Sequence, residues 1–249
     1  MKPSSKQQGP DRPGTDIIVR WLGAECAEFQ IRMPANPRLF LALHHAAADL
    51  RGPQYGAELG VCQAVAAYRA IAVYWKTPPA DPSQVIRRIR NFLRRHLHDA
   101  LADDPVPSSR DAFHETPAVH ALEIPVCYDG PDLSVVARSK AMTIQEVIRL
   151  HTSTTYTVAA IGFQAHFGYL WGLPISLHTP RRASPRTMVP AGSVGIGGSQ
   201  TGFYPSASPG GWQIIGSIEP TFAQQVSRAW QVGDQVRFVA TTSIPAPSV

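Results

Sequence analysis

Residues 179–186 carry the side chains of this sequence that are best suited to binding chemistry. The segment contains no acid that would neutralise its three arginines, and it reads Thr179-Pro180-Arg181-Arg182-Ala183-Ser184-Pro185-Arg186. A guanidinium group pairs with a carboxylate or a phosphate through two parallel hydrogen bonds. Because prolines stiffen the backbone, we expect an exposed cationic loop in which Arg181, Arg182 and Arg186 bind an anionic substrate or an acidic partner surface. The alternative is a charged loop that serves only solubility.

A glycine-rich segment at residues 192–202 invites comparison with a phosphate-binding loop. A dinucleotide fingerprint that starts at Gly195 would need a glycine where the chain has Gln200, and Pro205 blocks the helix that should hold the phosphates. The sequence also lacks a G-x-x-x-x-G-K-[ST] motif, so we expect any ATP that the protein uses to be held on another chain. The glycines are expected to serve strand bends and close backbone approach.

Ser193 lies in a degenerate form of the nucleophile elbow G-x-S-x-G, with Ala191 in place of the first glycine. The strand, turn and helix that should surround such a nucleophile are not indicated by the sequence. A catalytic Ser193 is therefore one hypothesis, and we favour Ser193 as a polar group that orients a ligand.

The acids and histidines of the chain are poorly placed for a metal. From Pro131 onward there are eight Lys or Arg but only four acids, which disfavours two-carboxylate catalysis and a hard metal. None of the nine histidines has a partner at the i, i+4 spacing of helical metal ligands. No metal site is expected. His151 ends a capped helix, where a cationic side chain is structurally favourable; its functional alternative is a proton carrier.

The composition indicates a globular chain with many strands. Hydrophobic residues make up 44% of its 249 residues and charged residues 16%. The 19 glycines and 23 prolines are about one residue in six, against roughly one in eight in an average protein. This excess disfavours a helix bundle and favours short strands joined by tight turns.

The first half predicts a small N-terminal α+β domain at residues 15–104, preceded by a disordered leader at residues 1–14. Asn36-Pro37 and Asp81-Pro82 are N-cap signals, and each is expected to open a helix. Apolar or alternating runs predict strands at residues 17–19, 27–32, 61–66 and 69–75.

Residues 105–117 are predicted to be a linker, residues 118–242 a second domain, and residues 243–249 a tail. Thr143 and Glu146 form a capping box that opens one helix of the second domain. The remainder is expected to be strand and turn, which favours a β-barrel or sandwich. The clearest strand candidates are residues 155–161, 194–196, 212–218 and 235–241.

Charge and hydropathy restrict the partners and the compartment. The net charge is +5, and an arginine-rich run at residues 87–95 lacks interleaved aromatics, so we expect a solvated helix face and no nucleic acid. Residues 1–14 lack the apolar core of a signal peptide, and residues 159–180 are too interrupted to span a membrane. Three widely spaced cysteines suggest buried free thiols in a reducing compartment. We expect a cytoplasmic protein with no membrane partner.

The second half resembles a known family in several specific motifs. The motifs are Ile124-Pro125-Val126-Cys127-Tyr128, Glu146-Val147-Ile148-Arg149-Leu150-His151, Val189-Pro190-Ala191-Gly192-Ser193-Val194-Gly195-Ile196, Gln200-Thr201-Gly202-Phe203-Tyr204-Pro205 and Ser208-Pro209-Gly210-Gly211-Trp212. In these motifs the chain is similar to the family of the 5-oxoprolinase B subunit, which is also called KipI or allophanate hydrolase subunit 1 and contains subdomains C and D of a carboxyltransferase domain. The resemblance covers roughly residues 122–216, and the first half agrees only loosely.

The resemblance implies an α+β fold, in which a small N-terminal α+β domain precedes a C-terminal cyclophilin-like β-barrel domain. It also implies the B subunit of an ATP-dependent 5-oxoprolinase, which converts 5-oxo-L-proline, ATP and water to L-glutamate, ADP and phosphate. The implied partners are a KipA-like C subunit and an A subunit of the LamB/YcsF type. This chain would be inactive alone, and ATP would lie at a site that is shared with or held by a partner.

The matched motifs also suggest which residues meet the ligand. Gln200, Thr201 and Tyr204 would position it through polar contacts. The turn Ser208-Pro209-Gly210-Gly211 would let the backbone approach it closely. These residues would act beside the three arginines, with His151 as the proton carrier.

Two other functions stay open at this point. A KipI-like module would inhibit a sensor histidine kinase, and it would need an exposed apolar groove near Phe163, Phe167 and Trp171. A component of a urea- or allophanate-type amide carboxylase or hydrolase would need a biotin-carrying partner. In addition, the family usually has Pro-Gly where this chain has Ala165-His166, and the loss of a residue that readily takes positive φ predicts a different loop shape.

Overall fold

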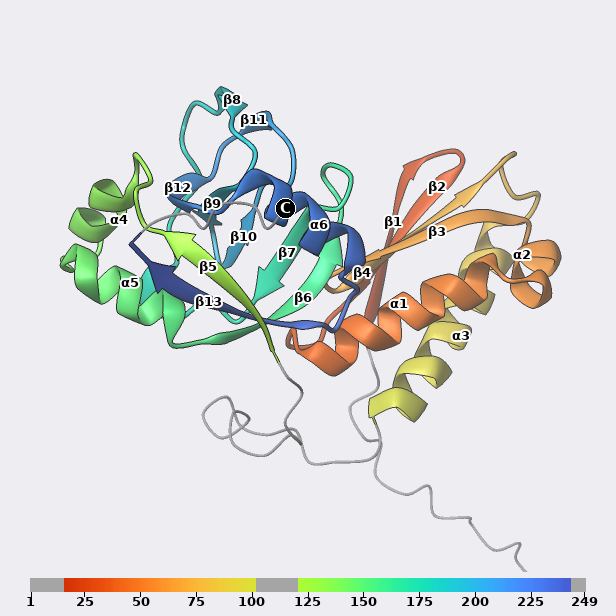
Figure 1. The fold of residues 1–249 in the computed structure, drawn as a ribbon. Coiled ribbons are helices and arrows are strands. Elements are labelled where there is room, and N and C mark those ends of the chain that lie inside the picture. Colours follow the sequence, from red (N-terminus) through yellow and green to blue (C-terminus); the bar gives the residue numbers. More distant parts are fainter. Residues whose placement is uncertain (1–15, 102–120, 243–249) are drawn as a thin grey trace, which may run out of the picture. The chain divides into compact units, whose positions relative to one another are not determined.

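The structure is a computed structural model that describes residues 16–101 and 121–242. The leader, linker and tail predicted at residues 1–14, 105–117 and 243–249 lie outside the described residues. The chain divides into two compact units, Met1–Pro105 and Val106–Val249 (Figure 1).

The N-terminal unit is a four-stranded antiparallel sheet with helices against one face. The strand order is β1-β2-β4-β3. All the strands and helices predicted for this half are confirmed, whereas the short helix α2 was missed because Gly56 and its seven-residue length hide its helical pattern. The elements are β1 (Ile17–Gly23), β2 (Cys26–Ile31), α1 (Pro37–Arg51), α2 (Pro53–Leu59), β3 (Val61–Ala67), β4 (Ala70–Trp75) and α3 (Pro82–Leu101).

Alternation in the strands and helical spacing in α1 and α3 bring one set of apolar side chains together. Phe29 of β2 and Ile71 of β4 are fully buried in one core. Leu43 of α1 and Leu93 of α3 belong to the same core and are also fully buried. The side chain of Asn36 accepts a hydrogen bond from a backbone N–H of the first turn at 3.0 Å, which caps α1 as the sequence indicates. This unit therefore has a core of its own.

The C-terminal unit is a closed seven-stranded barrel, in agreement with the predicted cyclophilin-like β-barrel. Its strand order is β10-β7-β6-β13-β5-β12-β9, and β13 pairs with β5 in parallel while the other neighbouring pairs are antiparallel. Strands β8 and β11 form a separate two-stranded sheet (Figure 1). The strands are β5 (Leu122–Cys127), β6 (Thr155–Ile161), β7 (Gly168–Trp171), β8 (Arg186–Val189), β9 (Ser193–Gly197), β10 (Gln200–Phe203), β11 (Ser208–Gly210), β12 (Gln213–Ser217) and β13 (Gln235–Thr241).

The expectation that this unit contains a single helix is wrong. Besides α5 (Ile144–Thr152), it has α4 (Leu133–Ser139), α6 (Pro220–Ala229) and the 3-10 turn η1 (Ile175–Leu177). The capping box of α5 is confirmed, since the Glu146 N–H donates to Thr143 Oγ1 at 3.2 Å and the Thr143 N–H donates to Glu146 Oε2 at 2.7 Å. Helix α4 is too short for a periodic pattern, and α6 is signalled only by Pro220 behind its N-cap Glu219.

The loop between β6 and β7 contains two residues other than glycine that adopt positive φ. His166 adopts φ +64°, and Phe163 adopts φ +70°. Both are left-handed conformations that glycine takes at no steric cost. These two positions therefore carry backbone strain, and the different loop shape expected from Ala165-His166 stays a prediction.

Candidate functional site

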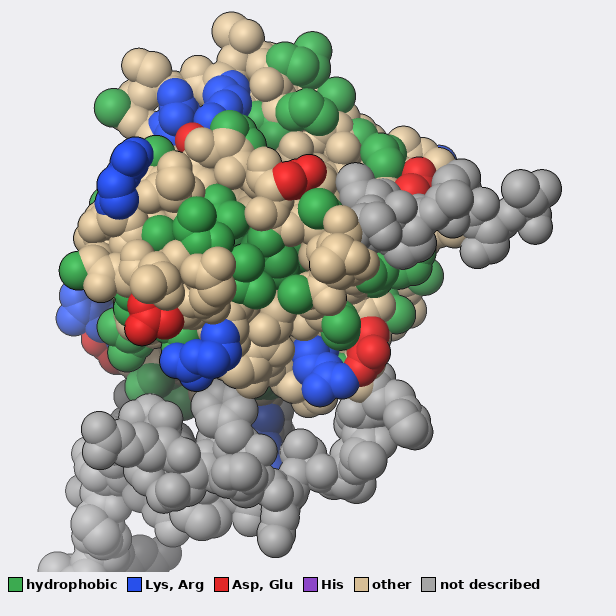
Figure 2. Space-filling view, turned by 60° about the vertical axis from the view of Figure 1, so that its left-hand side comes forward, with side chains coloured by type: hydrophobic (Ala, Val, Ile, Leu, Met, Phe, Trp, Pro, Cys, Tyr) green, Lys and Arg blue, Asp and Glu red, His purple; other side chains and the backbone are tan. Residues whose placement is uncertain are grey.

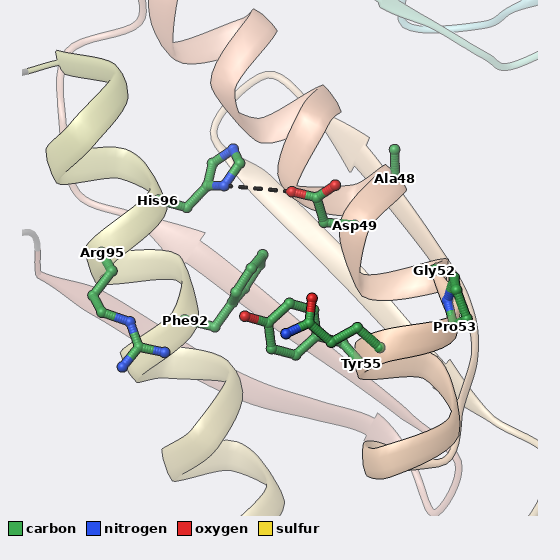
Figure 3. Close-up of a pocket in the computed structure, with 9 residues that line it drawn as sticks. Ala48, Asp49, Gly52, Pro53, Tyr55, Phe92, Arg95 and His96 are labelled. Carbon is green, nitrogen blue, oxygen red and sulfur yellow. Dashed lines mark ion pairs between the residues drawn. The ribbon is translucent and has the colours of Figure 1, made fainter.

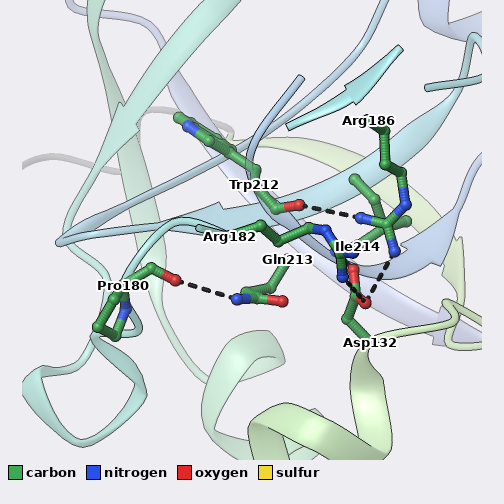
Figure 4. Close-up of polar contacts among 7 residues, drawn as sticks. All are labelled: Asp132, Pro180, Arg182, Arg186, Trp212, Gln213 and Ile214. Carbon is green, nitrogen blue, oxygen red and sulfur yellow. Dashed lines mark hydrogen bonds and ion pairs between the residues drawn. The ribbon is translucent and has the colours of Figure 1, made fainter. Parts of the chain in front are cut away.

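The tertiary fold brings an acid from elsewhere in the chain, Asp132, to the predicted cationic segment. Asp132 Oδ1 accepts hydrogen bonds from Arg182 Nη1 at 3.2 Å and from Arg186 Nη2 at 2.8 Å (Figure 4). The side chains of Arg182 and Arg186 are 37% and 23% exposed, and Arg181 is an exposed residue. The expectation of three exposed, uncompensated arginines is thus corrected: Arg181 is exposed, and the other two are ion-paired.

The carboxylate of Asp132 is ionised in this environment. Burial alone would raise its pKa, but hydrogen bonds from Arg186 and from the Ile214 N–H, together with the charges of Arg186 and Arg182, bring its pKa below the usual value. Because one carboxylate cannot neutralise two guanidinium groups, the cluster keeps a net positive charge. That charge, with exposed Arg181 next to it in sequence, is suited to an anionic ligand.

An aromatic wall, formed by Phe167, Tyr204 and Trp212, adjoins the arginines. Tyr204 is 2% exposed, and the ring centroid of Phe167 lies 5.3 Å from the ring centroids of both Tyr204 and Trp212. Burial raises the pKa of Tyr204, although a backbone hydrogen bond from Trp212 and the charges of Arg181 and Arg186 oppose this shift. The Tyr204 hydroxyl therefore stays neutral near the cationic cluster.

The glycines of the Ser208–Gly211 region serve internal packing. A Cβ on Gly210 would overlap the Tyr204 hydroxyl, and the Gly211 carbonyl accepts the N–H of Arg182 at 2.7 Å. Gly210 belongs to β11, so the predicted turn is a strand with Ser208 as its first residue. The space at Gly210 is therefore filled by Tyr204, and it is not left open for a ligand as the sequence suggested.

His151 and Thr201, predicted as separate site residues, lie in one buried network. His151 Nε2 is 2.8 Å from Thr201 Oγ1, and His151 Nδ1 is 2.7 Å from Tyr128 Oη. The imidazole is fully buried and stacks on Phe238 at a centroid distance of 4.7 Å. Burial lowers the pKa of His151 to about 3, so the ring is neutral. Its place is the interior of the barrel unit, and its role as a proton carrier stays a prediction.

Ser193 and Gln200 lie on paired strands of the barrel. Ser193 opens β9 and is buried, and its carbonyl accepts the N–H of Tyr204 at 2.9 Å. Strand β10 follows β9 where a nucleophile elbow would continue into a helix, so Ser193 does not lie in an elbow. Gln200 opens β10 opposite Gly197 and is half-buried.

The glycine-rich segment does not offer a phosphate cradle. It forms β9 and β10, which pair antiparallel. A Cβ on Gly197 would overlap the Trp212 ring, and one on Gly202 would lie 2.6 Å from the Gly168 carbonyl oxygen. The glycines thus admit neighbouring protein groups, as the sequence indicates. The residues of this segment do not fit a triphosphate.

Asp132 is a site residue that the sequence prediction missed. It precedes the apolar run of α4, and no motif marks it. One signal was available in the count of acids, because only four follow Gly130 and three of them have local tasks: Glu146 and Glu219 cap helices, and Asp234 accepts a backbone hydrogen bond within its own turn. Asp132 was therefore the acid left to pair with distant arginines.

The N-terminal unit contains a hollow of about 590 Å³ between α1, α2 and α3 (Figure 3). The ring centroids of Tyr55 and Phe92 lie 4.7 Å apart in its lining, and His96 Nδ1 lies 3.7 Å from Asp49 Oδ2. Arg95 lines it as well. None of the site residues predicted from the sequence lies in this hollow.

The surface features expected from the sequence are partly corrected. Phe167 is buried, so it cannot line an exposed apolar groove with Phe163, which is 62% exposed.

The cysteines are free, but Cys62 is exposed and the other two are half-buried, so the expectation of buried thiols is wrong. On the face shown in Figure 2, basic side chains are dispersed among hydrophobic and neutral ones.

Within residues 16–101 and 121–242, no group of three or more His, Cys, Asp or Glu side chains is placed to hold a metal ion. In the same part of the chain, no helix is both long and apolar enough to cross a membrane.

Curated relatives match either most of the chain or about half of it. The chain is 45% identical over 233 residues to the B subunit of 5-oxoprolinase from Bacillus subtilis (strain 168), in an alignment that covers 89% of this chain and 91% of that relative. It is 54% identical over 124 residues to the B subunit of 5-oxoprolinase from Haemophilus influenzae, in an alignment that covers 47% of this chain and 58% of that relative.

Solved structures share the fold. The crystal structure of TTHA0988 superposes with a TM-score of 0.60 at 28% identity, over 93% of this chain and 41% of that one. The urea carboxylase of Kluyveromyces lactis superposes with a TM-score of 0.61 at 14% identity, over 92% of this chain and 22% of that one, which is a likeness of fold alone. The family model for the carboxyltransferase domain, subdomain C and D, matches residues 17–229, which include the N-terminal sheet and every barrel strand except β13. The chain therefore belongs to the family of the carboxyltransferase domain, subdomain C and D.

Proposed function

We propose that this chain is the B subunit of an ATP-dependent 5-oxoprolinase. The observation that carries the proposal is the 45% identity to the Bacillus subtilis B subunit of 5-oxoprolinase over nearly the full length of both chains. The complex would convert 5-oxo-L-proline, ATP and water to L-glutamate, ADP and phosphate, with a KipA-like C subunit and a LamB/YcsF-type A subunit as partners.

The excess positive charge of the arginine cluster supports the proposal that the substrate is an anion. Arg181 is exposed, and Arg182 and Arg186 share the single carboxylate of Asp132, so positive charge is left over for a carboxylate of the substrate. The aromatic wall adjoins this charge, but its three side chains are buried, so it supports the site through internal packing and does not itself contact the ligand.

The glycine-rich strands give ATP no cradle on this chain. Because Trp212 and neighbouring backbone fill the space at Gly197 and Gly202, we expect a partner subunit to hold the nucleotide. The lactam amide of 5-oxoproline is stabilised by resonance, which is why we expect its opening to be coupled to ATP. This chain would therefore be inactive by itself.

The proposal is tested by reconstitution from purified subunits. Glutamate release from 5-oxoproline is expected only when ATP and all three subunits are present. Arg181→Ala should raise the KM for 5-oxoproline by about ten- to a hundredfold, because one charge-assisted contact contributes roughly 1.5–3 kcal/mol. Arg228→Ala, which removes an exposed arginine of α6, is the matched control. Absence of turnover with all three subunits, or turnover by this chain alone, would contradict the proposal.

A further inference from the structure

Asp132 is held from two sides beneath the arginines. Its Oδ2 accepts the N–H of Ile214 at 2.7 Å, and its own N–H donates to the Ile214 carbonyl at 2.9 Å. Its Oδ1 is shared by Arg182 and Arg186, and its side chain is only 4% exposed. The carboxylate cannot turn without breaking contacts to β12, so it is a rigid anchor for both guanidinium groups.

The arginines themselves come from a weakly supported segment. Arg186 opens β8, which forms a two-stranded sheet with β11 apart from the barrel. A two-stranded sheet is marginally stable by itself. The ion pair of Arg186 with Asp132 therefore connects this small sheet to β12 of the barrel. The loop before β8 is connected to β12 by a hydrogen bond from Gln213 Nε2 to the Pro180 carbonyl at 3.1 Å (Figure 4).

We propose that Asp132 is a positioning residue of the anion site, which orients Arg182 and Arg186 so that their remaining N–H groups meet the substrate. This inference rests on the proposed function, because the anion is taken to be the 5-oxoproline carboxylate. The guanidinium groups have five N–H donors each, and Asp132 occupies only part of them.

Two physical effects predict opposite results when the charge of Asp132 is removed. If Asp132 merely competes with the ligand, Asp132→Asn raises the net charge by one and binding tightens. If Asp132 positions the arginines, the same change frees them, and binding weakens because their ordering must then be achieved during binding. Positioning is the stronger effect here, because the ion pair between Arg186 and Asp132 is short, at 2.8 Å, and the Asp132 carboxylate is buried.

The first test uses the reconstituted three-subunit complex. Asp132→Asn should raise the KM for 5-oxoproline at least tenfold with a smaller change in kcat, and Asp132→Glu should give an intermediate KM. Asp129→Asn is the matched control, since Asp129 is exposed, lies nearby in sequence and accepts a hydrogen bond from Ser217 Oγ at 2.8 Å rather than from an arginine. An unchanged or lower KM in Asp132→Asn would overturn the proposal. Should that variant not fold, a wild-type KM in Asp132→Glu would overturn it.

The second test needs no activity. Phenylglyoxal modifies accessible arginines, and peptide mass spectrometry reports each site in the full-length chain. Arg182 and Arg186 should react more slowly than Arg181 in the wild type, and several-fold faster in Asp132→Asn. Equal rates in both proteins would reject the positioning role. If the three subunits with ATP release no glutamate from 5-oxoproline while the modification rates behave as expected, the proposed function fails and the arrangement of the arginines stands.

Discussion

Thr201 Oγ1 lies 2.8 Å from His151 Nε2, and both side chains are completely buried although they are 50 residues apart in the chain. Thr201 donates its hydroxyl proton to the Gly195 carbonyl at 3.0 Å, so it accepts from the Nε2–H of His151. Nδ1 then accepts the proton of the Tyr128 hydroxyl. The contacts thereby select one neutral tautomer of His151.

Thr201→Val should destabilise the fold. Valine fills a similar volume but leaves the His151 Nε2–H and the Gly195 carbonyl unsatisfied in a buried site, and each orphaned group costs about 1–3 kcal/mol. We expect a loss of about 2–6 kcal/mol in the free energy of unfolding, measured by urea denaturation. Thr201→Ser keeps the hydroxyl and should lose clearly less; equal losses in both variants would argue against the network.

Stability should fall at acidic pH because of His151. Its pKa is lowered by burial to about 3 in the folded state and is about 6.5 when unfolded, so the unfolded state binds the extra proton. The contribution is complete above about pH 6.5 and is lost progressively below it, by about 2 kcal/mol at pH 5. Urea denaturation at a series of pH values between about 5 and 6.5 measures the slope of the free energy of unfolding against pH. His151→Gln should flatten it, whereas exposed His166→Gln should not; a slope that survives in His151→Gln would assign the effect to another group.

Gly210→Ala should disturb the aromatic wall. The new Cβ would overlap the Tyr204 hydroxyl, and Tyr204 is buried among aromatic rings and cannot easily move. Overpacking of this kind costs about 1–3 kcal/mol in the free energy of unfolding. Gly162→Ala is the control, because a Cβ there meets nothing within 4 Å. A Gly210→Ala protein as stable as the control would contradict the packing described.

His166→Gly should stabilise the protein. His166 adopts φ +64° and is exposed, so glycine would relieve strain without removing a buried side chain. After the entropy cost of glycine, we expect a gain of up to about 1 kcal/mol. Ala165→Gly, at the adjacent exposed position without a positive φ, should instead lose stability. Thermal denaturation of both variants compares them directly, and a loss in His166→Gly would refute the strain.

Local signals in the sequence were sufficient for many elements. The Asn36-Pro37 cap and the Thr143–Glu146 capping box act within one helical turn, so residues close in sequence determine them. In the glycine-rich segment, Gln200 and Pro205 were sufficient to exclude a dinucleotide fingerprint, and the strand predicted at residues 194–196 is found as β9, whereas β10 was not predicted. Helices α2, α4 and α6 were missed, since seven to ten residues give little periodic signal.

The sequence by itself determined the family motifs, the caps and the presence of three arginines in one segment. Only the tertiary structure decided what those arginines contact, because Asp132 reaches Arg186 across 54 residues through the register of β12 and the placement of β8. It likewise joined His151 to Thr201. Such pairings depend on how distant strands align, and no local spacing in the chain encodes that alignment.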